Sequence, residues 1–147
     1  AQDDTGAESE LRPGQLADPG EPRFNTAGWR NDFSISSLPF DQIIGGVPPK
    51  DGIPASDDPQ FETIEDAPGW IDGLAPVIAV ELGDEAKASP MAVMTWHEIA
   101  NDSIGGEPVV VTFCPLCNTA LAFEATVDGV VKDFGTSGNI YFSNLIM

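Results

Sequence analysis

The chain has 147 residues, enough for one domain with its own core, and 41% of them are hydrophobic, as in a soluble globular protein. It has 24 acidic and 6 basic residues, and the net charge of −18 argues against nucleic acid or an anionic membrane as a partner. No run approaches the roughly 18 apolar residues of a membrane span, so we do not expect a membrane-spanning protein. Such an acidic surface suits salty surroundings or a basic protein partner.

The first ten residues, "AQDDTGAESE", are a small residue followed by a polar, acidic run. This pattern is typical of the sequence just after a cleaved signal peptide. We therefore predict an extracytoplasmic protein, periplasmic or secreted. In such a compartment a disulfide is the default state of paired cysteines.

Residues 1–50 are predicted to form an irregular arm rich in proline and acidic residues. Apolar residues are rare up to Phe24, which favours a disordered or surface-draped segment. Between Trp29 and Ile44 apolar residues recur, but proline and glycine interrupt them too often for long helices. We expect this part to be extended chain with short turns, packed over a core made elsewhere.

Residues 51–147 are predicted to form a β-rich domain. The stretch "PVIAVELGDEAKASP" predicts a hairpin that turns at Gly83-Asp84. A helix is expected next, with Ser89 as its N-cap and Pro90 at its first position. Its inward face would hold Met91, Met94, Trp96 and Ile99, and "NDSIGG" would end it.

Strands are predicted for the rest of this domain. The β-branched run "EPVVVTFC" indicates a buried strand. Asp128-Gly129 suits a type I′ turn and therefore predicts a hairpin. A last strand starts in "NIYFSNLIM", which stops on apolar residues, so we expect the polypeptide to continue beyond Met147. The predicted fold class is α+β and β-rich: antiparallel strands and hairpins, one short helix, and a long irregular N-terminal segment.

The chemistry-bearing residues are concentrated in a short window. "TFCPLC" contains the only two cysteines, Cys114 and Cys117, and the only histidine is His97. In an extracytoplasmic protein the Cys-x-x-Cys spacing fits a short-loop disulfide, a redox-active dithiol, or half of a metal site. Pro115 fixes one backbone dihedral between the cysteines and so stiffens the turn.

A metal site would need His97 near both sulfurs. The strand "VVVTFC" would return the chain toward the predicted helix that carries His97. Two sulfurs and one imidazole are a soft ligand set suited to copper or zinc, and Glu98 or Asp102 could complete it. The alternatives are a histidine that only hydrogen-bonds at a helix end and cysteines that form a plain disulfide.

Two better-known motifs fit poorly. In zinc deaminases a residue separates the histidine from the glutamate and the proline precedes the cysteines, whereas here His97 and Glu98 are adjacent and Pro115 lies between the cysteines. A thioredoxin motif lies at a strand-to-helix junction, but this one runs into a predicted strand and hairpin.

Four segments together resemble a known family. They are "IPASDDPQF", "PVIAVELGDEAKASP", "WHEIANDSIGGEPVVVTFCPLCNTALAF" and "DGVVKDFGTSGNIYFSNLIM". In order and spacing they are similar to the domain-of-unknown-function family 3179 of bacteria and archaea, over about Asp51 to Met147. Members look exported or membrane-anchored, and the family pattern continues past this segment. The resemblance implies no activity, but it implies these signature positions: Trp96, His97, Glu98, Asn101, Asp102, Cys114, Pro115 and Cys117.

Three functions follow as hypotheses. The first is an extracytoplasmic, non-catalytic binding module that holds a thiophilic metal, copper above all, through His97, Cys114 and Cys117. The second is an accessory subunit of a larger extracytoplasmic or membrane-attached complex, with Cys114–Cys117 as a disulfide and a basic partner for the acidic surface. The third is a thiol–disulfide oxidoreductase; it ranks last because His97 is the only nearby group that could lower a thiol pKa.

Overall fold

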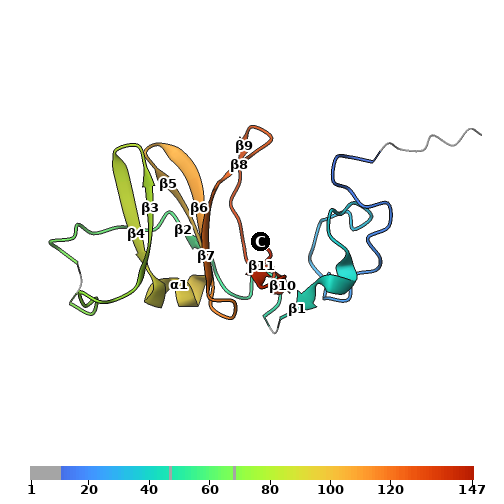
Figure 1. The fold of residues 1–147 in the computed structure, drawn as a ribbon, viewed down its shortest axis with the longest axis horizontal. Coiled ribbons are helices and arrows are strands. Elements are labelled where there is room, and N and C mark those ends of the chain that lie inside the picture. Colours follow the sequence, from blue (N-terminus) through green and yellow to red (C-terminus); the bar gives the residue numbers. More distant parts are fainter. Residues whose placement is uncertain (1–10, 47, 68) are drawn as a thin grey trace, which may run out of the picture.

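The computed structural model describes residues 11–46, 48–67 and 69–147. Its centre is a four-stranded sheet in the order β2-β5-β6-β7 (Figure 1). These strands are β2 (Ser56–Asp57), β5 (Ile99–Ile104), β6 (Glu107–Cys114) and β7 (Thr119–Glu124). β5, β6 and β7 are antiparallel neighbours, and the short β2 runs parallel to β5.

The central strand β6 is covered on both faces. Every residue from Val109 to Cys114 is buried, as predicted for this β-branched run. One face packs against helix α1 (Met91–His97) and the antiparallel hairpin of β3 (Val77–Leu82) and β4 (Glu85–Pro90). Their shared core contains Met94, Ala100, Val111 and Phe113, with Ile78, Val80 and Met91 packed against it.

The opposite face is covered by the C-terminal part of the chain. A small hairpin of β8 (Thr126–Val127) and β9 (Val130–Val131) turns at Asp128-Gly129, and both turn residues have positive φ, 52° and 74°. This confirms the turn predicted there. Buried Thr136 then donates to the carbonyl of Ile53 at 2.9 Å. β10 (Asn139–Tyr141) lies between β1 (Ile44–Gly45) and β11 (Asn144–Leu145) in a second sheet, and β11 contacts β6.

The arm, residues 11–50, has little regular structure but a cluster of its own. It contains one short 3-10 helix, η1 (Phe40–Gln42), besides β1. Four aromatic rings, those of Phe24, Trp29, Phe33 and Phe40, pack with centroids 5.9–6.1 Å apart. The arm therefore makes a local aromatic cluster, where the sequence suggested packing over a core made elsewhere. Residues 1–10, on which the export prediction rests, and residue 47 lie outside the described residues.

The predicted helix is correct in place but too long, and its inward face is partly wrong. Ser89 and Pro90 belong to β4, and α1 begins at Met91 without a side-chain cap. It ends at His97, because Glu98 is left-handed (φ 58°) and its N–H donates to Met94 at 2.8 Å. "NDSIGG" forms the end of β5 and its turn into β6, since pairing with β6 satisfies its backbone. Trp96 is 77% exposed.

The β-rich α+β class is confirmed. The described sheets are antiparallel except for the β2–β5 pair, and α1 is the one α-helix among the described residues. In the same part of the chain, no helix has the length and apolar character needed to cross a bilayer.

Candidate functional site

Cys114 and Cys117 form a disulfide at the end of β6. Their Cα atoms lie 5.2 Å apart, and the N–H of Cys117 donates to the carbonyl of Cys114 at 3.2 Å. Cys114 is 3% exposed, whereas Cys117 is half-buried at the rim of the sheet. In this oxidised form neither sulfur is a thiolate, so metal binding through them requires prior reduction.

The residues that follow Cys117 also hold the disulfide turn in place. Asn118 adopts the left-handed conformation (φ 51°), which lets the chain reverse into β7. The hydroxyl of Thr119 lies 3.2 Å from the carbonyl of Ser143, in the β10–β11 turn. The disulfide therefore lies between two strands. Many catalytic dithiols lie instead at a helix N-terminus, and that setting lowers their thiol pKa.

His97 occupies the last position of α1 and is half-buried. Its Nδ1 lies 2.9 Å from the carbonyl oxygen of Pro54. Because a carbonyl only accepts, Nδ1 carries a proton, and in the neutral form of the ring the lone pair is therefore on Nε2. A backbone carbonyl holds the ring of many metal-bound histidines in the same way, although a purely structural histidine is held so too.

Glu98 links the helix to the sheet through its backbone. Its carbonyl accepts from the N–H of Phe113 at 2.7 Å, which extends the β5–β6 pairing by one residue. Burial raises the pKa of the Glu98 carboxyl above its ordinary value. Partial burial disfavours the charged form of this carboxyl, so Glu98 is not simply a solvated surface charge.

Asp102 lies in an ion pair with a lysine. Both of its carboxylate oxygens accept from Nζ of Lys87 in β4, at 2.9 and 3.1 Å, and the same Nζ donates to the Ser103 carbonyl at 2.8 Å. The Asp102 side chain is 5% exposed, so the lysine compensates a nearly buried charge. This contact ties the β3–β4 hairpin to β5.

The predicted metal-ligand set is therefore only partly assembled. The cysteines are joined to each other, and Asp102 is paired with Lys87. Among the residues that the structure describes, no three or more His, Cys, Asp or Glu side chains are grouped so as to hold a metal ion.

Asn101 is more important structurally than its sequence context suggested. The sequence predicted it in the segment that ends the helix; instead it is buried in β5, and its amide bonds both backbone groups of Phe134, donating to the carbonyl and accepting from the N–H at 2.9 Å. Its amide nitrogen also donates to Asp57 at 2.7 Å. Asn101 thus joins β5 to β2 and to the chain that covers the sheet.

Three large apolar side chains are exposed near the disulfide turn. Trp96 at the end of α1, Leu116 in the turn itself and Phe142 in the β10–β11 turn are 77%, 84% and 75% exposed. All three come from turns or helix ends at the same end of the molecule, where α1, the β6–β7 turn and β10–β11 lie together in Figure 1. We call Trp96, Leu116 and Phe142 the apolar rim.

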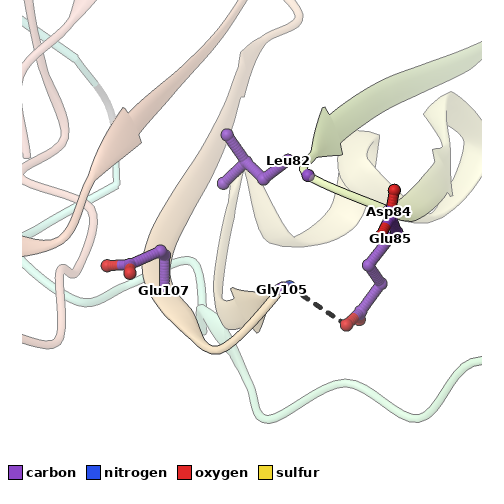
Figure 2. A pocket seen from close by; sticks show the side chains of 6 residues that line it. Leu82, Asp84, Glu85, Gly105 and Glu107 are labelled. Atoms are coloured by element: carbon purple, nitrogen blue, oxygen red, sulfur yellow. Dashed lines mark hydrogen bonds between the residues drawn. The ribbon is translucent and has the colours of Figure 1, made fainter.

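Two hollows of the surface, both formed by described residues, are not lined by any residue of this rim. The larger, of about 730 Å³, is formed by the β3–β4 and β5–β6 turns at the other end of β6. Figure 2 shows its acidic residues Asp84, Glu85 and Glu107, with Glu85 accepting from the N–H of Gly105 at 3.0 Å. A second hollow, of about 340 Å³, is lined by Asp57, Asn101 and Asp133 among others. Neither is lined by His97 or the cysteines.

The family model described as "Protein of unknown function (DUF3179)" matches residues 50–147. The chain belongs to this family. The match confirms the resemblance found in the sequence. No curated protein and no solved structure matches the chain significantly.

The geometry divides the positions that the resemblance implied as a signature into two kinds. Asn101 and Asp102 hold strands together, and the two cysteines close the β6–β7 turn. Trp96 is largely exposed, and His97 is half-buried with a fixed ring. Stability explains the first kind, so interaction with another molecule is best sought among the second.

Proposed function

We propose that the protein is an extracytoplasmic, non-catalytic binding module that docks onto a protein partner through the disulfide-bearing end of its sheet. The supporting observation is the exposure of the apolar rim on turns that are held in place. Trp96 lies in the last turn of the packed helix α1, Leu116 lies within the disulfide loop, and Phe142 precedes the Ser143 carbonyl that bonds Thr119. Large exposed apolar side chains on a rigid frame are a property of protein interfaces, and tryptophan is enriched among their strongest contributors.

The rim differs from other exposed apolar side chains of the chain. Ile64, Trp70 and Leu74 are also exposed, at 92%, 61% and 94%. They lie between β2 and β3, in a segment without helix or strand among its described residues. An interface built there would have to order that segment first, at a cost in entropy that the rim does not incur.

Compartment and charge support the same proposal. A disulfide that closes the β6–β7 turn suits an oxidising compartment. The net charge of −18 favours a partner with a basic surface, since complementary charges accelerate association and disfavour wrong partners.

The test compares native complexes from the organism that makes the protein. We expect the full chain to elute in a complex larger than itself at low salt, and a Trp96→Ala/Leu116→Ala variant to elute alone. Ile64→Ala/Leu74→Ala is the matched control, because it removes comparable exposed apolar surface elsewhere and should keep the complex. A full chain that elutes alone would contradict the proposal, and so would a rim variant that stays in the complex.

A second candidate is metal binding by the reduced protein. The observation in its favour is the bond from His97 to Pro54, which presents Nε2 as a fixed lone pair. A thiol or phosphine reductant that supplies two electrons would convert the disulfide to two thiols, and their thiolates with Nε2 would form a soft set for copper or zinc.

This candidate is tested by titrating Cu(I) against a competing chelator without oxygen. We expect one tightly bound ion in the reduced chain, none in the oxidised chain or in Cys114→Ser/Cys117→Ser, and at least about tenfold weaker binding in His97→Gln. Equal affinity of the reduced chain and His97→Gln would exclude His97 as a ligand. No binding by the reduced chain would exclude the site.

A further inference from the structure

The outer side of β7 is an open sheet edge. Within the described part of the chain, β7 pairs with β6 only and ends the sheet order β2-β5-β6-β7. Its residues are exposed except for the half-buried Thr119, and Leu121 and Phe123 are 38% and 44% exposed. An edge of this length without proline or lysine is a template for pairing with another strand.

The register identifies which backbone groups face outward. The N–H of Phe113 donates to Glu98 on the β5 side, and the N–H of Ala125 donates to Pro108 on the β6 side. Because bonding alternates along antiparallel strands, the even-numbered residues of β6 bond β7, through Thr119, Leu121 and Phe123. The N–H and C=O groups of Ala120, Ala122 and Glu124 therefore point to the open side.

The side chains of β7 form two different faces. Ala120, Ala122 and Glu124 lie beside Phe113, Val111 and Val109, on the face that α1 covers further in. Leu121 and Phe123 lie on the other face, beside Thr112 and Val110. An added strand would extend both faces, with apolar side chains next to Leu121 and Phe123 and longer polar ones over the two alanines.

The excess of acidic residues in this part of the chain favours a partner segment with positive charge. From Gly105 to Met147, the part of the chain that follows β5, the acidic residues are Glu107, Glu124, Asp128 and Asp133, and the only basic one is Lys132. Glu124 lies on β7 itself, on the alanine face. A lysine or arginine on the added strand could cover the alanines with its aliphatic stem and bring its charge to Glu124.

We propose that β7 is a strand-addition site for an extended, basic segment of a partner protein that alternates apolar with Lys or Arg side chains. This rests on the proposed function as a docking module and names the partner's chemistry. β7 starts at the disulfide turn, so an added strand would continue from the apolar rim along the sheet. Main-chain bonds at residues 120, 122 and 124 would supply affinity, and the alternation would supply specificity.

The probe is a blocked synthetic peptide, as long as β7, that alternates valine with lysine. Its controls are a peptide that alternates valine with glutamate and one with the same lysines and valines in two blocks, which keeps the charge but loses the alternation. Binding is followed by amide NMR and hydrogen exchange on the full oxidised chain. We expect the alternating lysine peptide to slow exchange at Ala120, Ala122 and Glu124 at least tenfold, and neither control to do so.

The decisive variant is Ala122→Pro. It removes an N–H that faces outward and leaves the hydrogen bonds to β6. The variant should therefore fold but no longer bind the alternating lysine peptide. Ala122→Thr is the matched control, because it keeps the N–H and should keep binding. If Ala122→Pro does not fold, Glu124→Gln is the deciding variant. It should weaken binding of the lysine peptide severalfold and leave the amide spectra of the rest of the chain unchanged.

The outcomes separate this inference from the proposed function. Equal binding of the block and alternating peptides, or full binding by a folded Ala122→Pro variant, would overturn strand addition. So would concentration-dependent dimerisation that Ala122→Pro abolishes, since the occupant would then be a second copy of the chain. A native complex that is lost on rim substitution but unaffected by Ala122→Pro would leave the docking function in place and remove only strand addition.

Discussion

The two edges of the central sheet differ in how they end. At one edge, β2 has two residues, and Asn101, Asp57 and the Asp58 N–H bind it to β5. His97 bonds Pro54 just before that strand. At the other edge, β7 has six residues, and within the described part of the chain no strand pairs with its outward backbone groups. The sheet thus closes one edge with polar side chains and leaves the other available, so the open edge is where an interaction is expected.

The largest effect is predicted at the closed edge, for Asn101→Ala. The change would leave the N–H and C=O of Phe134 without their partner and remove the bond to Asp57. Groups left unsatisfied in a buried site cost about 1–3 kcal/mol each, so we expect a loss of about 3 kcal/mol in the free energy of unfolding, measured in urea.

Ser103→Ala is the control for this prediction. Ser103 lies on the same strand but is exposed, so its substitution should change the free energy of unfolding by less than about 0.5 kcal/mol. If Asn101→Ala were as stable as Ser103→Ala, the closed edge would not depend on Asn101.

A smaller effect is predicted for reduction of the disulfide next to the open edge. Because Cys114 and Cys117 close a very short loop, chain entropy predicts a loss of about 2 kcal/mol on reduction. Urea unfolding of the oxidised and reduced chain measures it, and hydrogen exchange locates it. Exchange should rise first at Thr119 and along β7, while β5 near Asn101 stays protected. Uniform loosening of both edges would contradict a local role of the disulfide.

Hydrogen exchange of the free protein tests the open edge directly. The amides of Leu121 and Phe123 donate toward β6, whereas those of Ala120 and Ala122 face outward. We expect the outward amides to exchange at least about tenfold faster than their neighbours at low protein concentration. Equal protection along β7 would mean that its edge is already covered.

The contrast between the edges also explains what the sequence could and could not predict. The β6 strand, the hairpin at residues 77–90 and the Asp128-Gly129 turn were predictable because local patterns determine them. The early end of α1 was not, because β5 competes with the helix for residues 99–104 through pairing with β6.

The role of Asn101 could not be predicted either. Its partners Asp57 and Phe134 lie 44 and 33 residues away in the sequence, and no local signal links them. For the site, the Cys-x-x-Cys spacing left disulfide and metal open, and the structure has the disulfide. The exposure of Trp96 went against the predicted inward face, because a helix of 7 residues buries only Met94 fully.

The smallest effect is predicted for Glu98, which joins α1 to the sheet near the closed edge. Burial raises the pKa of its carboxyl in the folded chain above the ordinary value of 4.5, so the folded state binds a proton more tightly than the unfolded state. Stability from this group is therefore complete below about pH 4.5 and is lost as the pH rises through the raised pKa. The charged carboxylate is disfavoured at neutral pH, and Glu98→Gln should raise the free energy of unfolding there by a few tenths of a kcal/mol. Urea unfolding of both chains between pH 4 and 7 measures the difference, with exposed Glu81→Gln in β3 as the control, which keeps Glu98 and should therefore keep the pH dependence of the wild type. Equal pH dependence in wild type and Glu98→Gln would show that the Glu98 carboxylate is fully solvated, and that the junction between α1 and β5 rests on its backbone bonds alone.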